Sequence, residues 1–111
     1  MKRAILCVLA LALLVGIASA ARMKSGVHVG ISGTTDVTTT GRFFEFTLIN
    51  DGDNAVDLYF YYGATSSDHS LGDRSARVPS GGTFYSRPDE PVSGYRLVVV
   101  SGSTDVYTSY E

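Results

Sequence analysis

The chain has 111 residues, a formal net charge of −2 and one cysteine, Cys7. This length allows a single domain, and the negative charge argues against nucleic acid, because neutralising phosphates requires a cationic surface. With no second cysteine an internal disulfide is excluded, so hydrophobic burial alone must hold the fold.

Residues 1–20 have the features of a signal peptide. Two basic residues follow Met1, an uncharged apolar run covers 4–18, and Ala18-Ser19-Ala20 fits the small-x-small rule for cleavage. We therefore expect the rest of the chain to be exported to the periplasm, the cell surface or the medium. The alternative is an uncleaved anchor, since residues 4–21 approach the length of a membrane-spanning helix. Removing residues 1–20 leaves seven basic and eleven acidic residues, a net charge of −4.

Beyond residue 20, apolar and polar side chains alternate with a period of two, and no helical stripe is present. A short segment, 21–26, is expected to precede a domain spanning 27–111. In the second expected strand, Phe44, Phe46 and Leu48 fall on one side and should face the core. The expected strands cover 27–32, 42–49, 55–62, 83–85, 95–100 and 106–110.

Turn signals separate these strands. The run Asn50-Asp51-Gly52-Asp53-Asn54 is the strongest hairpin signal, because Asp-Gly and Asn supply the positive φ angles of a tight turn. Further turns are expected at 79–82, 88–94 and 101–103. The Thr-rich stretch 33–41 is either an exposed edge strand or a solvated connection, and the polar segment 63–77 is expected to be a long loop.

The predicted fold is all-β: a small antiparallel β-sandwich of six or seven strands. The order of strand, Asn-Asp-Gly turn, strand, long loop, Pro-x-Gly turn and Gly-Tyr-x-Leu-Val-Val-Val resembles immunoglobulin-like and fibronectin-III-like modules in general pattern. Tyr95 opens its strand where such modules place a corner tyrosine. The resemblance implies an architecture and carries no function.

Catalytic and metal sites find little support. Asp68-His69-Ser70 places the three residue types of a hydrolytic triad side by side, but neighbours on an extended chain point in different directions, and no nucleophile elbow is present. We expect no enzyme and no cofactor. Asp51, Asp53 and Asp57 make a weak calcium candidate, because Asp and Asn are also what a turn uses for backbone reasons.

Tyrosines and the polar segment are the stronger binding candidates. Tyr59 and Tyr61 are out of phase with the core residues of their strand, and Tyr107 takes the same phase on the last strand. If those strands are neighbours, the rings would form an exposed platform suited to a glycan or a protein. Binding residues favour loops, which adds the charged residues of 63–77, namely Asp68, His69, Asp73, Arg74 and Arg77.

Three functions are compatible with these features. The first is an exported, non-enzymatic module that binds a protein or glycan through residues 63–77 and its exposed tyrosines. The alternative is a self-assembling surface or shell protein, in which Thr-rich edges such as 34–40 pair between copies of a homo-oligomer. A small secreted hydrolase is the second alternative.

Overall fold

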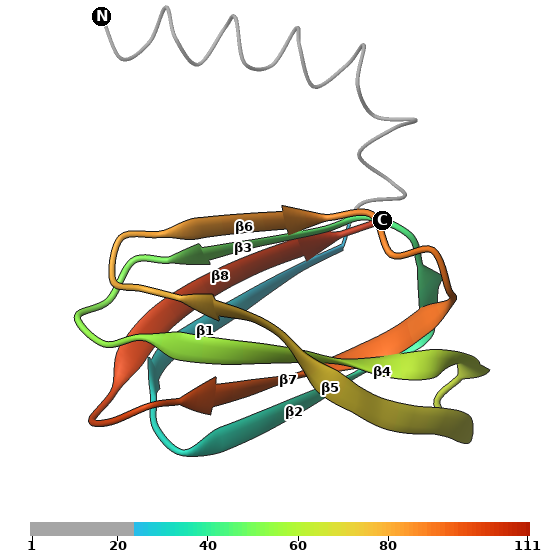
Figure 1. Cartoon of the computed structure of the whole chain (residues 1–111), viewed down its shortest axis with the longest axis horizontal. Helices are drawn as coiled ribbons and strands as arrows, with labels where there is room; N and C mark the ends of the chain where they lie inside the picture. Colours follow the sequence, from blue (N-terminus) through green and yellow to red (C-terminus); the bar gives the residue numbers. More distant parts are fainter. Residues whose placement is uncertain (1–23) are drawn as a thin grey trace, which may run out of the picture.

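The computed structural model describes residues 24–111, which form two packed β-sheets (Figure 1). The expected signal peptide, 1–20, lies outside these residues. Within residues 24–111, no helix has the length and apolarity needed to cross a bilayer. The strands are β1 (Lys24–Ile31), β2 (Thr34–Phe43), β3 (Phe46–Asn50), β4 (Val56–Thr65), β5 (Asp68–Val78), β6 (Thr83–Ser86), β7 (Val92–Val99) and β8 (Thr104–Tyr110).

The strand order is that of a jelly roll. Sheet A has the order β1-β8-β3-β6 and sheet B the order β2-β7-β4-β5, with antiparallel pairing throughout. Eight strands in two such sheets define the jelly roll, whereas an immunoglobulin sandwich pairs its first two strands in one sheet. The predicted antiparallel sandwich is confirmed. The strand count of six or seven is wrong, and the immunoglobulin-like order is not found.

Most connections pass from one sheet to the other. Only β4 and β5 are both consecutive and paired. The segment 50–54 is therefore not a hairpin: it carries the chain from β3 in sheet A to β4 in sheet B, and no residue of it has a positive φ. In any tight connection the side chains of Asp and Asn bond backbone groups and Gly adds conformational freedom, so the presence of these residues does not reveal which strands pair.

The predicted loop at 63–77 is wrong, because most of it is strand β5. The chain turns at Ser66 and Ser67, and β5 then pairs antiparallel with β4. β5 lies at the edge of sheet B, and its register with β4 shifts at three places. An exposed, irregular edge strand loses clean alternation, which explains why the pattern resembled a loop. The Thr-rich stretch 33–41 lies mostly in β2, the opposite edge strand, which agrees with the first of its two interpretations, an exposed edge strand.

The core lies between the sheets and is centred on Phe46. This fully buried ring contacts those of Phe43, Phe60 and Tyr95, with centroids 4.9–5.7 Å apart. The expectation that Phe44 faces the core is wrong: Phe44 is 47% exposed, and the guanidinium of Arg42 lies over its ring. β2 ends at Phe43 and β3 begins at Phe46, so the chain changes sheet here and the alternation is interrupted.

Residues 24–111 form both sheets and the core, so we expect this part of the chain to fold on its own. The other core side chains are Leu48, Val56, Leu58, Val78, Val92, Leu97 and Val106. β1 begins at Lys24, within the segment 21–26 that the sequence places ahead of the domain.

Tyr95 is a buried link between the sheets rather than a corner tyrosine. Its hydroxyl lies 2.8 Å from Thr108 Oγ1 on β8 and 3.0 Å from His28 Nε2 on β1. A corner tyrosine would bond a nearby backbone group instead. Burial raises the pKa of Tyr95 to about 12 and lowers that of His28, because it disfavours the charged form of each.

Candidate functional site

The outer surface of sheet B gathers most of the polar and aromatic candidates, and we call it the sheet B face. In β4, Val56, Leu58 and Phe60 point into the core, so the residues between them point outward. The register places Asp36, Arg96, Tyr59 and Arg74 in one row across all four strands. The polar and aromatic side chains that define it are Asp36, Asp57, Tyr59, Tyr61, His69, Arg74, Arg77 and Arg96. The register also places Leu71 opposite Tyr61 and Val98 opposite Asp57.

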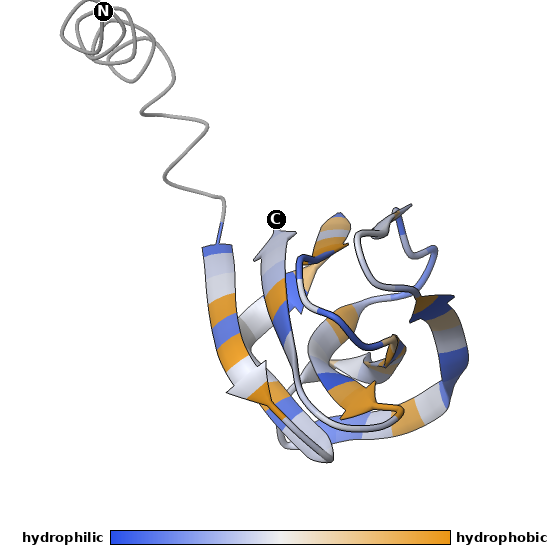
Figure 2. Ribbon diagram, turned by 90° about the vertical axis from the view of Figure 1, so that its left-hand side faces the viewer, coloured by the Kyte–Doolittle hydropathy of each residue, from blue (hydrophilic) through white to orange (hydrophobic). Residues whose placement is uncertain are grey.

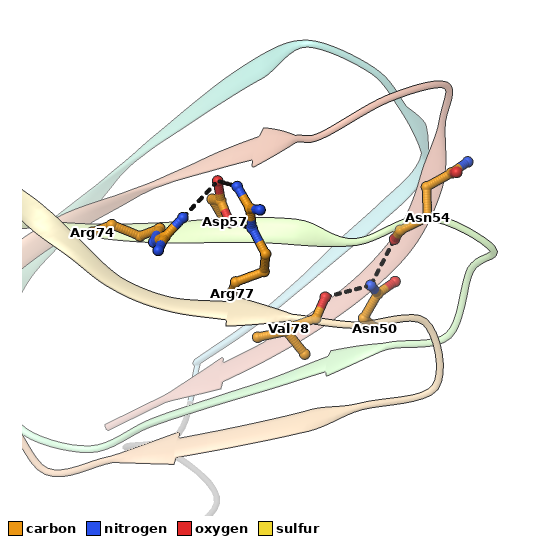
Figure 3. A network of polar contacts seen from close by, with 6 residues as sticks. All are labelled: Asn50, Asn54, Asp57, Arg74, Arg77 and Val78. Atoms are coloured by element: carbon orange, nitrogen blue, oxygen red, sulfur yellow. Dashed lines mark hydrogen bonds and ion pairs between the residues drawn. The ribbon is translucent and has the colours of Figure 1, made fainter.

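Asp57 organises one half of this face (Figure 3). Its carboxylate accepts two hydrogen bonds from Arg77, at 2.7 and 2.9 Å, and lies 3.7 Å from Nη1 of Arg74. The hydrogen bond from Arg77 holds the pKa of Asp57 below its usual 3.8, against the opposing effect of burial. Both arginine side chains are about half exposed. Arg74 makes the longer contact of the two, at 3.7 Å against 2.7 Å for Arg77.

Asp36 organises the other half. Its carboxylate accepts hydrogen bonds from Arg96 at 2.7 and 3.2 Å and from the Tyr61 hydroxyl at 2.8 Å. The hydrogen bond from Arg96 lowers the pKa of Asp36. Tyr61 passes over Gly94, where an added Cβ would lie only 2.7 Å from the carbonyl oxygen of Val37. An added Cβ at Gly94 would also lie 3.3 Å from Cδ2 of Tyr61, so the absence of a side chain there leaves room for the ring.

His69 connects the β4–β5 hairpin to β7. Its ring stacks on Tyr61 with centroids 4.5 Å apart, and its Nδ1 lies 2.8 Å from Oγ of Ser93 on β7. Ser93 is fully buried, and its hydroxyl donates to the carbonyl of Thr65 at 3.1 Å. The Ser93 hydroxyl thus lies between His69 of β5 and the backbone of Thr65 in β4, and it ties this hairpin to β7.

The Asp57 ion pairs predict an acid-dependent loss of stability. Since the pKa of Asp57 is lowered on folding, its contribution is complete above the usual value of 3.8 and disappears as the pH falls through the lowered pKa. We expect Asp57→Asn to be less stable than the wild type at about pH 6, and this difference to shrink as the pH falls below 3.8 and through the lowered pKa of Asp57. Urea unfolding across this range measures it. A constant difference at every pH would show that the charge of Asp57 is not responsible.

The structure brings five of the predicted binding residues together and separates three. Tyr59, Tyr61, His69, Arg74 and Arg77 lie on the sheet B face. Tyr107 lies on β8 of sheet A, so the shared platform of three tyrosines does not form. Asp68 is exposed beside the hairpin turn, and Asp73 is exposed on β5, where it forms no ion pair with any described residue.

The calcium candidates do not converge on a site. Asp57 is engaged by two arginines, while Asp51 and Asp53 are exposed in the connection between the sheets. Across residues 24–111, no three His, Cys, Asp or Glu side chains are grouped closely enough to hold a metal ion.

Asp36 and Arg96 belong to the face but were not predicted. They lie 60 residues apart in the chain and meet only because β2 and β7 pair. Arg96 did carry a signal, since it is the only charge in the apolar run 95–100. A charged side chain in a central strand needs an oppositely charged or hydrogen-bonding partner, but the sequence does not show which residue this partner is.

No protein-family model and no curated protein matches the chain. Among solved structures, the SPBc2 prophage-derived protein YomS has a TM-score of 0.52 and 16% identity, covering 79% of this chain and 91% of that one. FeII HppE has a TM-score of 0.50 and 12% identity, covering 84% of this chain and 45% of that one. PirA has a TM-score of 0.48 and 20% identity, covering 79% and 91%.

At these identities the likeness shows the fold alone: the chain is an all-β protein of two antiparallel sheets, similar in fold to YomS.

Proposed function

We propose that this chain is an exported, non-catalytic module that binds an acidic polysaccharide on the sheet B face. One observation carries the proposal: the outward-facing Tyr59 lies opposite Arg96 on one neighbouring strand and Arg74 on the other, with Arg77 close by. An aromatic side chain beside guanidinium groups offers a stacking surface for a sugar ring and donors for its carboxylate.

The charge distribution favours an anionic ligand at this face. Residues 24–111 contain six basic and eleven acidic side chains, a net charge of −5. Three of the basic and two of the acidic side chains lie on the sheet B face, which gives it a net charge of +1, while all other described residues together carry −6. A polyanion is therefore attracted to this face and repelled elsewhere.

The shape of the face favours a polymer over a small molecule. The rows run straight across the sheet, and neighbouring strands are about 4.8 Å apart, so the groups spread over roughly 14 Å from β2 to β5. Small ligands are usually enclosed in a cleft, whereas an extended chain can contact a series of groups on an open surface. The proposed export would bring the module to the extracellular polymers that it binds.

Binding of polygalacturonate, alginate and hyaluronate to residues 24–111 tests the proposal. We expect at least one polymer to bind, with an affinity that falls in high salt. Arg74→Ala should weaken binding about tenfold to a hundredfold, through loss of a charged hydrogen bond. Tyr59→Ala should weaken it about tenfold, and Arg74→Lys should rank between Arg74→Ala and the wild type, because lysine keeps the charge but not the planar fork.

Matched controls are available on the rest of the molecule. Arg87→Ala and Tyr85→Ala remove the same residue types away from the sheet B face and should leave binding unchanged. Esterifying the polygalacturonate carboxylates should abolish binding if their charge is recognised. Failure of all three polymers to bind, or equal binding of the esterified polymer, would overturn the proposal.

A further inference from the structure

Strand β1 lies at the edge of sheet A and is held there from one side. It pairs with β8, and the pairing is interrupted between His28 and Ile31, where Gly30 has a φ of 63°. Figure 2 shows β1 as the strand that continues from the grey trace. Its Val27 and Val29 side chains are 65% and 66% exposed, whereas Ile31 packs against the core. β1 therefore gains little from hydrophobic burial, and its other inward-facing side chain, His28, matters for its attachment.

His28 connects β1 to the opposite sheet through a chain of three polar groups. Its Nε2 lies 3.0 Å from the Tyr95 hydroxyl on β7, and that hydroxyl lies 2.8 Å from Oγ1 of Thr108 on β8. The Gly26 backbone closes the chain from the β1 side, since a Cβ added there would lie 2.6–2.9 Å from all three groups. Because Tyr95 is fully buried and Thr108 is 4% exposed, their hydroxyl groups must satisfy each other within this chain.

The direction of these hydrogen bonds depends on the charge of His28. When Nε2 carries no hydrogen, the Thr108 hydroxyl donates to Tyr95 and the Tyr95 hydroxyl donates to Nε2, so each hydrogen has an acceptor. A protonated imidazole must instead donate from Nε2 to Tyr95, which then donates to Thr108. The Thr108 hydroxyl hydrogen is left without an acceptor, because Tyr95 is the only hydrogen-bond partner of this side chain among the described residues. A buried donor without an acceptor destabilises the arrangement, and so does the partly buried charge.

The surroundings of His28 do not offset its positive charge. The titratable side chains that face it or share its side of the paired strands are Tyr95 on β7, Tyr110 on β8 and Lys24 on β1. Two carboxylates on adjoining strands are engaged elsewhere: Asp105 on β8 accepts a hydrogen bond from the N–H of Gly30 at 2.7 Å, and Asp36 on β2 pairs with Arg96 on the sheet B face. Burial accordingly lowers the pKa of His28 below its usual 6.5.

We propose that β1 is an acid-released strand: protonation of His28 breaks its link to Tyr95, and β1 then separates from β8 while the rest of the sandwich stays folded. The weak attachment of β1 makes this local opening easier than unfolding of the whole domain. Since the pKa of His28 is lowered in the folded state, the penalty is absent above 6.5 and grows as the pH falls from there through the lowered pKa. Separation leaves β8 as the edge of sheet A, with unpaired backbone groups.

Amide hydrogen exchange followed by NMR tests the proposal on the chain from Ala21 onward, which keeps β1 intact. After correction for the intrinsic exchange rate, protection of the β1 amides should fall about threefold or more between about pH 7.5 and about pH 5, while the β7 amides keep theirs. His28→Gln retains a polar group that can bond Tyr95 but does not titrate, so its β1 amides should show no such change. His69→Gln is the matched control, because it replaces the other histidine of the chain on sheet B and should retain the pH dependence of β1.

A second readout needs no substitution, because NMR titration of the His28 ring should give a pKa below 6.5. The wild-type exchange and this titration decide the matter even where His28→Gln fails to fold. The proposal is overturned by β1 protection that is the same at both pH values, by a His28 ring that titrates at 6.5 or above, or by a His28→Gln variant that loses protection as the wild type does. Equal loss of protection in every strand would also overturn it, since acid would then unfold the whole sandwich.

Discussion

Replacing Asn50 with alanine is expected to lower the free energy of unfolding by about 3–4 kcal/mol. Asn50 is completely buried, and its side-chain amide donates to the carbonyls of Asn54 and Val78 at 2.8 and 3.0 Å (Figure 3). Its side-chain oxygen accepts from the Thr104 hydroxyl at 2.7 Å and from the backbone N–H of Gly52 at 3.3 Å. One side chain thus joins β3 and the following connection to β5 and β8.

The cost comes from the partners that alanine leaves behind. Each buried polar group without a hydrogen bond costs about 1–3 kcal/mol. Water that enters the space left by the amide can bond only some of the groups that Asn50 bonded. Urea unfolding followed by circular dichroism or tyrosine fluorescence measures the change, since the chain has no tryptophan.

Asn54→Ala is the matched control for this prediction. Asn54 belongs to the same connection, but its amide donates to the carbonyl of Ser103 in an exposed hydrogen bond of 2.7 Å. Because water replaces an exposed hydrogen bond easily, we expect a loss of about 1 kcal/mol or less. Equal losses at Asn50 and Asn54 would contradict the buried role of Asn50.

Phe46→Ala is expected to have the largest effect of any single substitution considered, a loss of about 3–5 kcal/mol. The Phe46 ring is fully buried and contacts two aromatic rings of sheet B strands, Phe60 at 5.2 Å and Tyr95 at 4.9 Å between centroids. Its removal leaves a cavity between the two sheets and takes edge-to-face contacts away from both neighbours. A domain of this size has only about 5–10 kcal/mol of stability, so much of the variant should be unfolded on mild heating.

Phe44→Ala tests whether that effect depends on position. Phe44 lies two residues away in sequence but is 47% exposed, with the Arg42 guanidinium 5.2 Å from its ring centroid. We expect this variant to lose about 1 kcal/mol or less, since an exposed cation–π contact is worth about 0.5–1 kcal/mol. Thermal unfolding of the two variants compares them directly. A larger loss at Phe44 would mean that the sequence-based assignment of its side chain was right.

The candidate site could be predicted from the sequence only within a single strand. The alternation in β4 correctly separated Tyr59 and Tyr61 from the core residues, because the side of the sheet on which a side chain lies depends on its position in the two-residue period of the strand. It could not show that Tyr107 belongs to the other sheet, or that Asp36 lies beside Arg96, because both facts depend on which strands pair. The polar composition of 63–77 predicted a loop, whereas the structure has an edge strand that carries His69, Arg74 and Arg77.

The sequence by itself determined that this domain is made of strands, where most of them lie and which positions hold turns, because these properties follow from side-chain period and local backbone preference. Only the tertiary structure decided the partners of each strand. The connection at 50–54 has the chemistry of a hairpin and yet joins two sheets, since the pairing of β3 with β8 and of β4 with β7 is set by contacts distant in sequence. Those pairings gather the charged and aromatic side chains of the sheet B face on one side of the sandwich.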